Sequence, residues 1–276
     1  MQAEIIMGTS LPLPLFKRGK VRDVYSVGNR LLIVSTDRIS AFDVVLPNGI
    51  PCKGEALNRL SSYWFSKTGD IVANHVVEVV DPRTVLVEKT TPIKIEFVVR
   101  GYLYGSLLDS YRQGKTSLPK GLKKAEKLKS AIITPTTKSD VGHDVELSRD
   151  DVLEQIGKSM AAEIEEASFR IYEKASQKAE ANGIIVADTK LEFGLHKEEL
   201  MLIDECLTPD SSRFWLKDKH QIGQDQFSYD KQYVRDYLLS IGWNKQPPAP
   251  RLPEHVALET SKKYIEAYER LTGRKF

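Results

Sequence analysis

One segment, residues 184–194, limits the possible folds of this chain more than any other. It opens with Ile184-Ile185-Val186, a β-branched run that is typical of a central strand, and continues with Asp188, Lys190 and Glu192 at alternate positions. Side chains two residues apart in a strand lie on the same face, so we expect two carboxylates and an ammonium to project together. A solvated outer face is the ordinary explanation of such alternation. The apolar opening favours a strand inside a sheet instead.

The chain is expected to turn back after this strand as a hairpin. Residues 183–193 would form the first strand, 194–198 the turn and 199–205 the return strand, which is apolar at Met201-Leu202-Ile203. A turn centred near Glu198 places Glu192 opposite Asp204, and cross-strand partners are about 4.5–5.5 Å apart at Cβ. Two carboxylates that close repel each other unless a cation lies between them, and oxygen ligands suit Mg²⁺, which also binds ATP phosphates. The residues alone therefore indicate a Mg²⁺–nucleotide site, with a solvated face as the alternative.

The rest of the pattern predicts that the first ninety residues are mostly β and that helices follow further along the chain. Strands are expected at residues 20–25, 30–36, 75–80, 84–88 and 93–100, with a helix at 55–67. The stretch 118–137 is rich in Lys, Pro and Gly, which predicts a loop region. Ser148 and Asp151 have the spacing of a capping box for a helix over 151–181, which Asn182-Gly183 would end. Further helices are expected at 230–240 and 254–272, on either side of a proline-rich linker.

The composition narrows the class of protein. Forty Lys and Arg residues against 38 Asp and Glu leave a formal charge of +2, which gives no reason to expect nucleic acid as a partner. Neither Cys52 nor Cys206 lies in a C-x-x-C pair, so we expect two reduced thiols. The first residues do not resemble a signal peptide, and no stretch approaches the roughly 20 apolar residues of a membrane span. A cytoplasmic protein without a membrane partner is expected, and its oligomeric state is left open.

Five blocks of sequence follow one another in an order known from one enzyme family. They are Gly19-Lys-Val-Arg-Asp-Val-Tyr25, Ser35-Thr-Asp-Arg-Ile-Ser-Ala-Phe-Asp43, Ile95-Glu-Phe-Val-Val-Arg-Gly-Tyr-Leu-Tyr-Gly-Ser106, Val186-Ala-Asp-Thr-Lys-Leu-Glu-Phe-Gly194 and Asp204-Glu-Cys-Leu-Thr-Pro-Asp-Ser-Ser-Arg-Phe-Trp215. The chain thereby resembles the phosphoribosylaminoimidazole-succinocarboxamide synthase (SAICAR synthetase) family. One departure is Lys94, where a proline is expected two residues before Glu96, with Pro92 displaced. The difference concerns the backbone leading into the strand and not the chemistry.

The resemblance implies an α+β fold with two lobes, SAICAR-synthase-like and ATP-grasp-like. Residues 1–90 would form an antiparallel β lobe that binds nucleotide, and residues 91–276 a larger α+β lobe with the C-terminal helices. Members of the family use ATP to join the carboxylate of carboxyaminoimidazole ribonucleotide to the amine of L-aspartate in purine biosynthesis. A carboxylate is a poor electrophile, so ATP converts it to an acyl phosphate, from which the amine displaces phosphate. ATP, Mg²⁺ and these two small-molecule substrates are therefore the expected ligands.

The resemblance also gives candidate roles to individual residues. The positions that match ATP contacts are Gly19, Lys20, Arg22, Glu88, Thr90, Glu192 and Asp204. Among these, Glu192 and Asp204 are the expected Mg²⁺ ligands, which agrees with the reasoning from the hairpin. Asp188 and Lys190 match catalytic positions near the substrate carboxylate and the transferred phosphoryl group.

Two further groups match the substrates. The ribonucleotide positions are Asp37, Arg38, Ser40, Asp43, Arg100, Ser106, Arg213, Lys231 and Arg235, among which the guanidinium groups suit a phosphate. For Lys231 and Arg235, an ordinary solvated helix face explains the pattern nearly as well. Lys138, His143 and Asp144 match a segment associated with aspartate, and a mobile surface loop is the alternative there. The base that deprotonates the aspartate amine is not assigned.

Two other classes of protein are weighed against a ligase. A small-molecule kinase, another ATP phosphotransferase, also combines a β-rich first lobe with a metal-binding carboxylate pair, but the chain has no H-R-D or D-F-G-like run. A nucleotide sensor would bind ATP without turnover and could lose its catalytic groups. Both carboxylates and Lys190 are present, which favours an enzyme.

Overall fold

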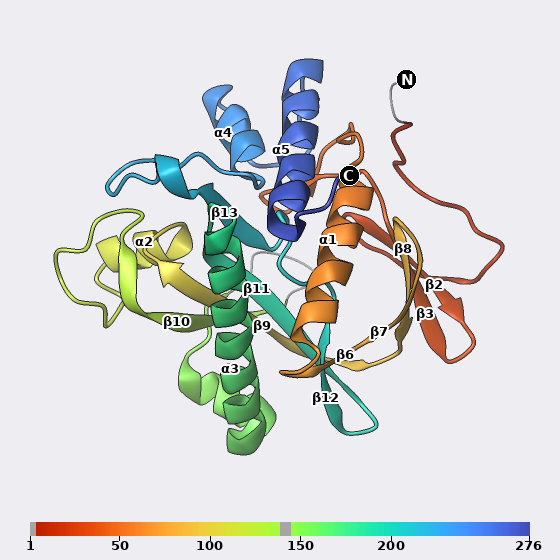
Figure 1. The fold of residues 1–276 in the computed structure, drawn as a ribbon, viewed down its shortest axis with the longest axis horizontal. Helices are drawn as coiled ribbons and strands as arrows, with labels where there is room; N and C mark the ends of the chain where they lie inside the picture. The colour runs from red at the N-terminus through yellow and green to blue at the C-terminus, as the bar shows by residue number, and fades with distance from the viewer. Residues whose placement is uncertain (1–3, 139–144) are drawn as a thin grey trace.

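The first of the two larger sheets among the described residues is built from the N-terminal part of the chain (Figure 1). The structure is a computed structural model that describes residues 4–138 and 145–276. The strands of this first sheet, in spatial order and all antiparallel, are β1 (Leu15–Arg18), β2 (Arg22–Val27), β3 (Arg30–Ser35), β8 (Thr84–Glu88) and β7 (Val76–Asp81). The four strands expected in this region are confirmed, with ends that shift by at most two residues.

The second sheet has β11 (Ile184–His196) at its centre. Its strand order is β10-β9-β11-β12-β6, and β13 also pairs with β11. These strands are β6 (Ala73–Asn74), β9 (Thr91–Tyr102), β10 (Lys127–Thr137), β12 (Glu199–Ile203) and β13 (Ser212–Leu216). The short strands β4 (Ser40–Ala41) and β5 (Val44–Val45) pair only with each other. The expected strand at 93–100 is confirmed and is longer than predicted.

The prediction of a loop over residues 118–137 is wrong for its second half. Residues 127–137 form β10, which pairs antiparallel with β9 from Ile132↔Arg100 to Thr137↔Ile95. Lys, Ser and Pro residues in this stretch do not favour a strand. The strand forms because β9 lies beside it and provides the backbone hydrogen-bond partners. Pro135 is tolerated because β10 lies at the end of the strand order, where a missing backbone N–H costs little.

The expected helices are present. They are α1 (Lys53–Thr68), α3 (Arg149–Ala181), α4 (Gln232–Ser240) and α5 (Glu254–Thr272), and a short α2 (Ser106–Arg112) and the 3₁₀ turn η1 (Lys217–Lys219) join them. The capping box of α3 is confirmed, because the Ser148 hydroxyl accepts from the Asp151 N–H and the Asp151 carboxylate accepts from the Ser148 N–H. Gly157 interrupts this helix with a non-helical backbone of φ 75° and ψ 162°. Gly273 ends α5 in the left-handed helical conformation, φ 71° and ψ 14°, which helix C-termini favour.

The largest core cluster lies between α3, the second sheet and the helices α1 and α5. Ile164, Ile171 and Ala175 from one side of α3 are fully buried in it, as are Leu191 and Phe193 from β11. One face of β11 therefore packs on α3, so the alternate side chains Asp188, Lys190 and Glu192 lie on the other face. This packing positions the site described below.

The chain passes from one sheet to the other at residues 89–90, between β8 and β9. The first sheet comes wholly from residues 15–88, whereas β6 from the same stretch pairs with β12 of the second sheet. The α+β class is confirmed, while the lobe boundary near residue 90 stays a prediction. Cys52 and Cys206 are both free thiols. Among the described residues, no helix is both long and apolar enough to span a membrane.

Candidate active site

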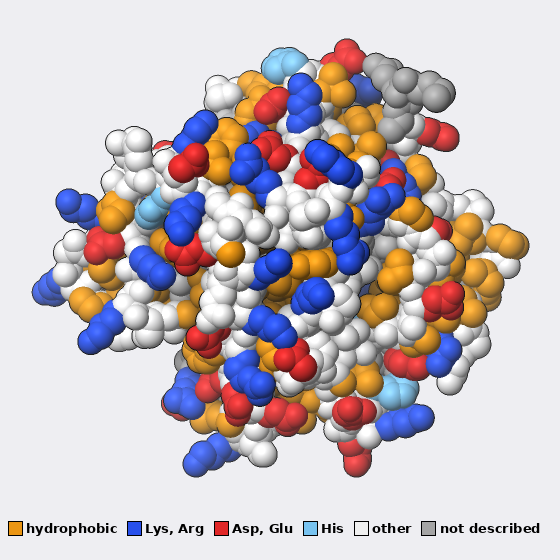
Figure 2. Space-filling view, in the orientation of Figure 1, with side chains coloured by type: hydrophobic (Ala, Val, Ile, Leu, Met, Phe, Trp, Pro, Cys, Tyr) orange, Lys and Arg blue, Asp and Glu red, His pale blue; other side chains and the backbone are white. Residues whose placement is uncertain are grey.

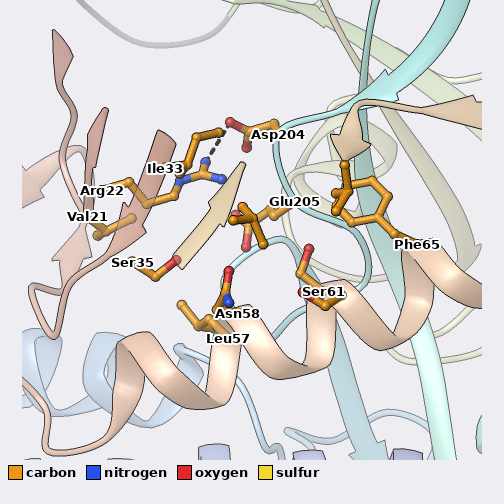
Figure 3. Close-up of a pocket in the computed structure, with 13 residues that line it drawn as sticks. Val21, Arg22, Ile33, Ser35, Leu57, Asn58, Ser61, Phe65, Asp204 and Glu205 are labelled. Carbon is orange, nitrogen blue, oxygen red and sulfur yellow. Dashed lines mark hydrogen bonds and ion pairs between the residues drawn. The ribbon is translucent and has the colours of Figure 1, made fainter. Parts of the chain in front are cut away.

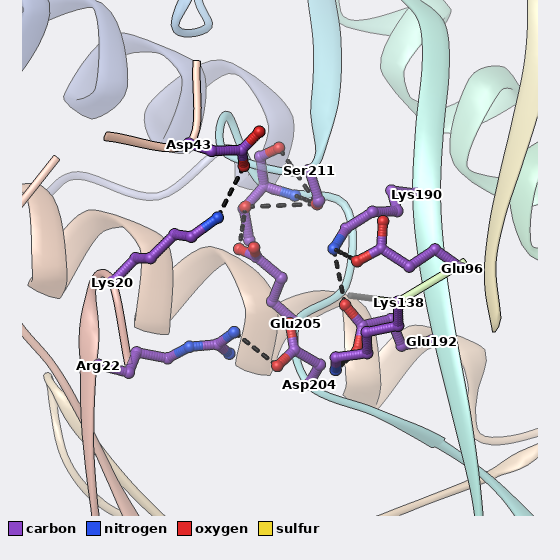
Figure 4. A network of polar contacts seen from close by, with 11 residues as sticks. Lys20, Arg22, Asp43, Glu96, Lys138, Lys190, Glu192, Asp204, Glu205 and Ser211 are labelled. Atoms are coloured by element: carbon purple, nitrogen blue, oxygen red, sulfur yellow. Dashed lines mark hydrogen bonds and ion pairs between the residues drawn. The ribbon is translucent and has the colours of Figure 1, made fainter. Parts of the chain in front are cut away.

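Both carboxylates on the charged face of β11 are buried, and Lys190 between them in the sequence is partly exposed. Asp188 and Glu192 are only 3% and 4% exposed. The Lys190 ammonium lies 2.6 Å from Glu192 Oε1 and 2.5 Å from Glu96 Oε1 on β9 (Figure 4). Lys138 donates to the other oxygen of Glu192. Burial of this kind rules out the ordinary solvated-strand explanation, because charges are taken out of water only when they are paired or bind a ligand.

The register predicted for the hairpin is wrong by one residue. Glu192 pairs with Ile203, because the turn consists of only Lys197 and Glu198, both with positive φ. That geometry makes a tight two-residue turn, which is normally signalled by Asn-Gly or Asp-Gly. Asp204 therefore lies one position beyond β12, where its own φ of 68° turns the chain out of the strand.

Asp204 reaches the same site by this turn and connects it to the first sheet. Its Oδ1 accepts a hydrogen bond of 2.6 Å from Arg22 Nη2 on β2 (Figure 4). Burial alone would raise the pKa of Asp204, but the charges of Arg22, Lys138 and Lys190 outweigh it and hold the pKa well below its usual range. The carboxylate is thus ionised at neutral pH and lies within the influence of the same lysines that contact Glu192.

Lys190 is held in its charged form. Burial would lower the pKa of Lys190, but the neighbouring carboxylates of Glu192 and Glu96 outweigh burial and raise the pKa well above its ordinary value. An ammonium with these partners donates hydrogen bonds and supplies positive charge. It is unsuited to act as a base at neutral pH.

A second cluster gathers around Asp188. In the sheet register Asp188 lies opposite Arg100 of β9 on one side and Arg213 of β13 on the other. Asp188 Oδ2 is 2.5 Å from Arg213 Nη1 and 3.5 Å from Arg100 Nη1, and Arg100 Nη2 donates to the Ser106 hydroxyl at 3.0 Å. Among the described residues, the buried Nε of Arg213 has no hydrogen-bond partner. Two adjacent guanidinium groups, one of them with an unused donor, suit an anionic group such as a phosphate.

Gly105 permits this cluster to form. Its backbone has φ 58° and ψ −140°, a conformation open essentially only to glycine. A Cβ at this position would lie 2.6 Å from Arg213 Nη2. The guanidinium of Arg213 therefore occupies the space that any other residue would need for its side chain.

The expected phosphate contacts of the first sheet lie at the edge of this site. Gly19 makes a tight turn in which its N–H donates to the Arg22 carbonyl at 2.8 Å. Lys20 forms an ion pair of 2.7 Å with Asp43, and both side chains are about half exposed. Ser40 lies on the neighbouring β4. The fold thus brings Lys20 to Asp43, a residue that was expected near the ribonucleotide.

Asp37 and Arg38 have structural contacts that account for them fully. Asp37, which is completely buried, accepts from the Gly54 N–H at the start of α1 and from Arg83. Arg38 donates to the carbonyls of Met7, Gly19 and Lys20 and to Asp23, and it is 8% exposed. Arg38 therefore stabilises the turn at Gly19 by donating to the carbonyl groups of Gly19 and Lys20. A direct contact of either residue with a substrate stays a prediction.

The segment expected to meet adenine connects the two sheets. Glu88 ends β8 in an ion pair of 2.8 Å with Arg30. Thr90 lies against Gly194 of β11, where an added Cβ would be 3.0 Å from the Thr90 hydroxyl. The backbone of this crossing segment thus packs directly on the strand that carries Glu192.

Lys231 and Asp210 belong to a buried charge cluster that the sequence did not predict. Asp210, whose side chain is 2% exposed, accepts from Lys53 Nζ at 2.8 Å, from Lys231 Nζ at 3.1 Å and from the Tyr264 hydroxyl at 2.9 Å. The cluster joins the start of α1, the start of α4 and α5. Lys231 is therefore not part of a solvated helix face, and Arg235 lies one turn further along α4. The only signal in the sequence was Asp210 within the last of the five blocks.

Replacing Asp210 by asparagine is expected to destabilise the fold by about 3–5 kcal/mol, because fully buried Lys53 would lose its counter-charge. The measurement is the free energy of unfolding in denaturant. The matched control is Glu180→Gln, which breaks the exposed pair Lys217–Glu180 at 2.9 Å and should cost less than about 1 kcal/mol. Equal stability of the Asp210 variant and the wild type would show that this cluster does not hold the helices together.

Of the three positions expected to contact aspartate, the structure describes one. Lys138 lies on Glu192, at the end of β10, and so within the main network. His143 and Asp144 lie outside the described residues. The prediction for this segment therefore rests on Lys138 alone.

A pocket lies beside this network on the inner face of the first sheet (Figure 3). Its lining combines apolar side chains from the sheet and α1 with charged groups at one end, and includes Ile33, Val85, Leu57, Phe65, Arg22 and Asp204. On the face of the molecule seen in Figure 2, Lys and Arg side chains are interspersed with Asp and Glu side chains. Apolar walls beside a charged end suit a ligand with a flat apolar part and an anionic part.

The donor set also fits a hard cation. Within residues 4–138 and 145–276 there is no group of three or more His, Cys, Asp or Glu side chains placed to hold a metal ion. Mg²⁺, however, is commonly held by only one or two carboxylates together with substrate phosphates. Glu192 and Asp204 each already direct an oxygen at a protein cation, so both carboxylates suit such a role.

The sequence and the fold of this chain are similar to those of one family of enzymes. The family model described as SAICAR synthetase matches residues 15–250. A phosphoribosylaminoimidazole-succinocarboxamide synthase of Desulfosudis oleivorans is 49% identical, over 98% of this chain and 99% of that protein. The structure of a SAICAR synthase from Saccharomyces cerevisiae complexed with SAICAR has a TM-score of 0.90 at 38% identity, and covers 98% of this chain and 99% of that one. A type-2 SAICAR synthetase in complex with ADP has a TM-score of 0.74 at 25% identity, over 94% and 98% of the two chains.

Proposed function

The chain belongs to the SAICAR synthetase family, and from this premise we infer that its buried charged network is the site where ATP drives the reaction. The enzyme is an ADP-forming carbon–nitrogen ligase of purine biosynthesis, which joins L-aspartate to carboxyaminoimidazole ribonucleotide. The observation that carries the assignment to this site is Lys190, held charged between Glu96 and Glu192. Both substrates and ATP are anionic. To bind them side by side, the site needs fixed positive charge where water is largely excluded.

ATP is proposed to lie between the two sheets. Lys20 and Arg22 would contact its phosphates, and the backbone of residues 88–90 would meet adenine. Glu192 and Asp204 would hold Mg²⁺ against the phosphates, which would neutralise their charge. The apolar pocket beside Arg22 supports this placement, and the ADP complex of a relative supports the binding of an adenine nucleotide. It also agrees with the proposed division into lobes of residues 1–90 and 91–276.

The ribonucleotide is proposed to bind at the cluster around Asp188. Arg100, Arg213 and Ser106 would bind its phosphate, because a guanidinium fork matches phosphate oxygens. The main support is the unused buried Nε of Arg213. Lys231, Arg235, Ser40 and Asp43 would complete this binding site on the side of α4 and β4.

The catalytic roles follow from these contacts. Asp188 orients Arg100 and Arg213 from the middle of the sheet, next to Lys190 on the same strand. Lys190 stabilises negative charge as the phosphoryl group moves to the substrate carboxylate and as the aspartate amine displaces phosphate from the acyl phosphate. Lys138, together with His143 and Asp144, is proposed to bind aspartate. Because Lys190 is held protonated, the proton of the attacking amine goes to another group.

The decisive experiment measures ADP release while each substrate is omitted in turn. ADP is expected only when ATP, carboxyaminoimidazole ribonucleotide and L-aspartate are all present. The expected products are SAICAR and inorganic phosphate, whereas a small-molecule kinase would yield a stable phosphoester. ADP release at the full rate without aspartate would contradict the proposal that this site couples ATP cleavage to ligation.

A further inference from the structure

Glu96 occupies a position that none of the roles above explains. It is the Cα partner of Glu192 on the neighbouring strand, so the two carboxylates lie on the same face of the sheet. Both are nearly buried, at 8% and 4% exposed. Like charges directly opposite each other in a sheet destabilise it unless a cation separates them. Lys190 Nζ is that cation, at 2.5 Å from Glu96 and 2.6 Å from Glu192.

The cations of the network differ in which carboxylates they contact. Arg22 contacts Asp204, and Lys138 contacts Glu192, so both lie on residues proposed to bind Mg²⁺. Lys190 contacts Glu192 in the same way but also contacts Glu96, which is on a different strand (Figure 4). A divalent cation on Glu192 and Asp204 would repel all three side chains and compete with them for the carboxylate oxygens. Within the described residues, only Lys190 would then keep a second carboxylate in direct contact, whereas Arg22 would keep only the longer-range attraction of Glu205.

From this arrangement we propose that Glu96 is a positioning residue, which keeps the Lys190 ammonium in place while Mg²⁺ and ATP occupy Glu192 and Asp204. The proposal rests on the function proposed above. Arg22 and Lys138 are released toward phosphate and substrate, whereas Lys190 stays anchored to β9. A lysine side chain has four flexible carbons, and a misplacement of about 1 Å at the reacting groups can cost about 10²-fold in rate.

The test compares Glu96→Gln with Glu192→Gln. Glutamine at position 96 preserves length and a hydrogen-bond acceptor but removes the charge that holds Lys190. We expect kcat to fall about 10- to 100-fold, with the KM values for ATP and the ribonucleotide within about 3-fold of wild type. Binding of Mg²⁺-ADP, measured by calorimetry, should stay within about 3-fold of wild type, whereas Glu192→Gln should weaken it at least about 10-fold.

Two further variants separate positioning from folding. Glu96→Asp keeps the charge on a shorter side chain and should recover part of the lost kcat, which a purely structural role of residue 96 would not require. Glu180→Gln changes an exposed carboxylate paired with Lys217 and should behave as wild type throughout. The melting temperature of each variant shows whether the fold is retained.

Two results would overturn the proposal. Weakening of Mg²⁺-ADP binding by Glu96→Gln as large as that by Glu192→Gln would make Glu96 a metal or nucleotide contact. Wild-type kcat in Glu96→Gln would mean that Lys190 needs no second anchor. Failure of the proposed function would be seen in the wild-type enzyme itself. It would then release ADP at the same rate with and without aspartate.

Discussion

Replacing Glu192 by glutamine is expected to reduce kcat/KM for ATP by about 10³-fold, because a bound metal ion supplies several kcal/mol of charge stabilisation. The amide has the shape of the carboxylate but no charge for Mg²⁺. It also leaves Lys138 and Lys190 without one of their anionic partners. The measurement is the initial rate of ADP release across a Mg²⁺ titration, in which the variant should need far more Mg²⁺ than the wild type.

The same hairpin offers a control for this variant. Glu199 is the exposed first residue of β12, opposite His196, and is not part of the charged network. Glu199→Gln should therefore leave both the rate and the Mg²⁺ requirement unchanged. Normal activity of Glu192→Gln at ordinary Mg²⁺ concentrations would remove Glu192 from the proposed metal site.

Replacing Gly105 by alanine should be nearly as damaging, but through the other substrate. The added Cβ would lie 2.6 Å from Arg213 Nη2, and the backbone at φ 58° is itself strained for alanine. Arg213 would have to move, which removes a proposed phosphate contact and disturbs Asp188. We expect kcat/KM for the ribonucleotide to fall about 10²-fold or more, while calorimetric binding of Mg²⁺-ADP changes little.

Gly114 provides a matched control because it also has a positive φ, 69°, but no atom lies within 4 Å of an added Cβ. Gly114→Ala also places alanine at a positive φ, but without the collision at Arg213. Its kinetics should therefore stay close to wild type, even if its stability drops slightly. Equal losses of ribonucleotide affinity in both variants would show that strain, and not the displacement of Arg213, is responsible.

The hairpin shows how far reasoning from periodicity reaches. The alternation of Asp188, Lys190 and Glu192 correctly predicted one charged face on a strand inside a sheet. The predicted pairing of Glu192 with Asp204 was wrong, because Lys197 and Glu198 form a two-residue turn without the residues that usually mark one. A shift of one residue normally sends a side chain to the opposite face. Asp204 still reaches the site, because it has left the strand.

The strand β10 and the Asp210 cluster were missed for a related reason. Residues 127–137 become a strand because β9 lies beside them, and Asp210 matters because Lys53 and Lys231 fold against it. Neither partner is near in the chain: Lys53 and Asp210 are 157 residues apart. Likewise, Asp37 and Arg38 stand in a block that resembles a binding motif, yet their side chains hold the start of α1 and the turn at Gly19.

The sequence by itself determined what depends on neighbouring residues: the alternation along β11, the capping box at Ser148, the end of α5 at Gly273, and the ordered blocks that identify the family. These are local effects, set by backbone geometry and by side chains a few positions apart. Only the tertiary structure decided which charges meet. Arg22 pairs with Asp204 across 182 residues because the two sheets pack together, and Lys190 pairs with Glu96 across 94 residues because β9 and β11 are neighbouring strands. In that setting an ion pair depends on its partner, since a buried charge without one is too costly to keep.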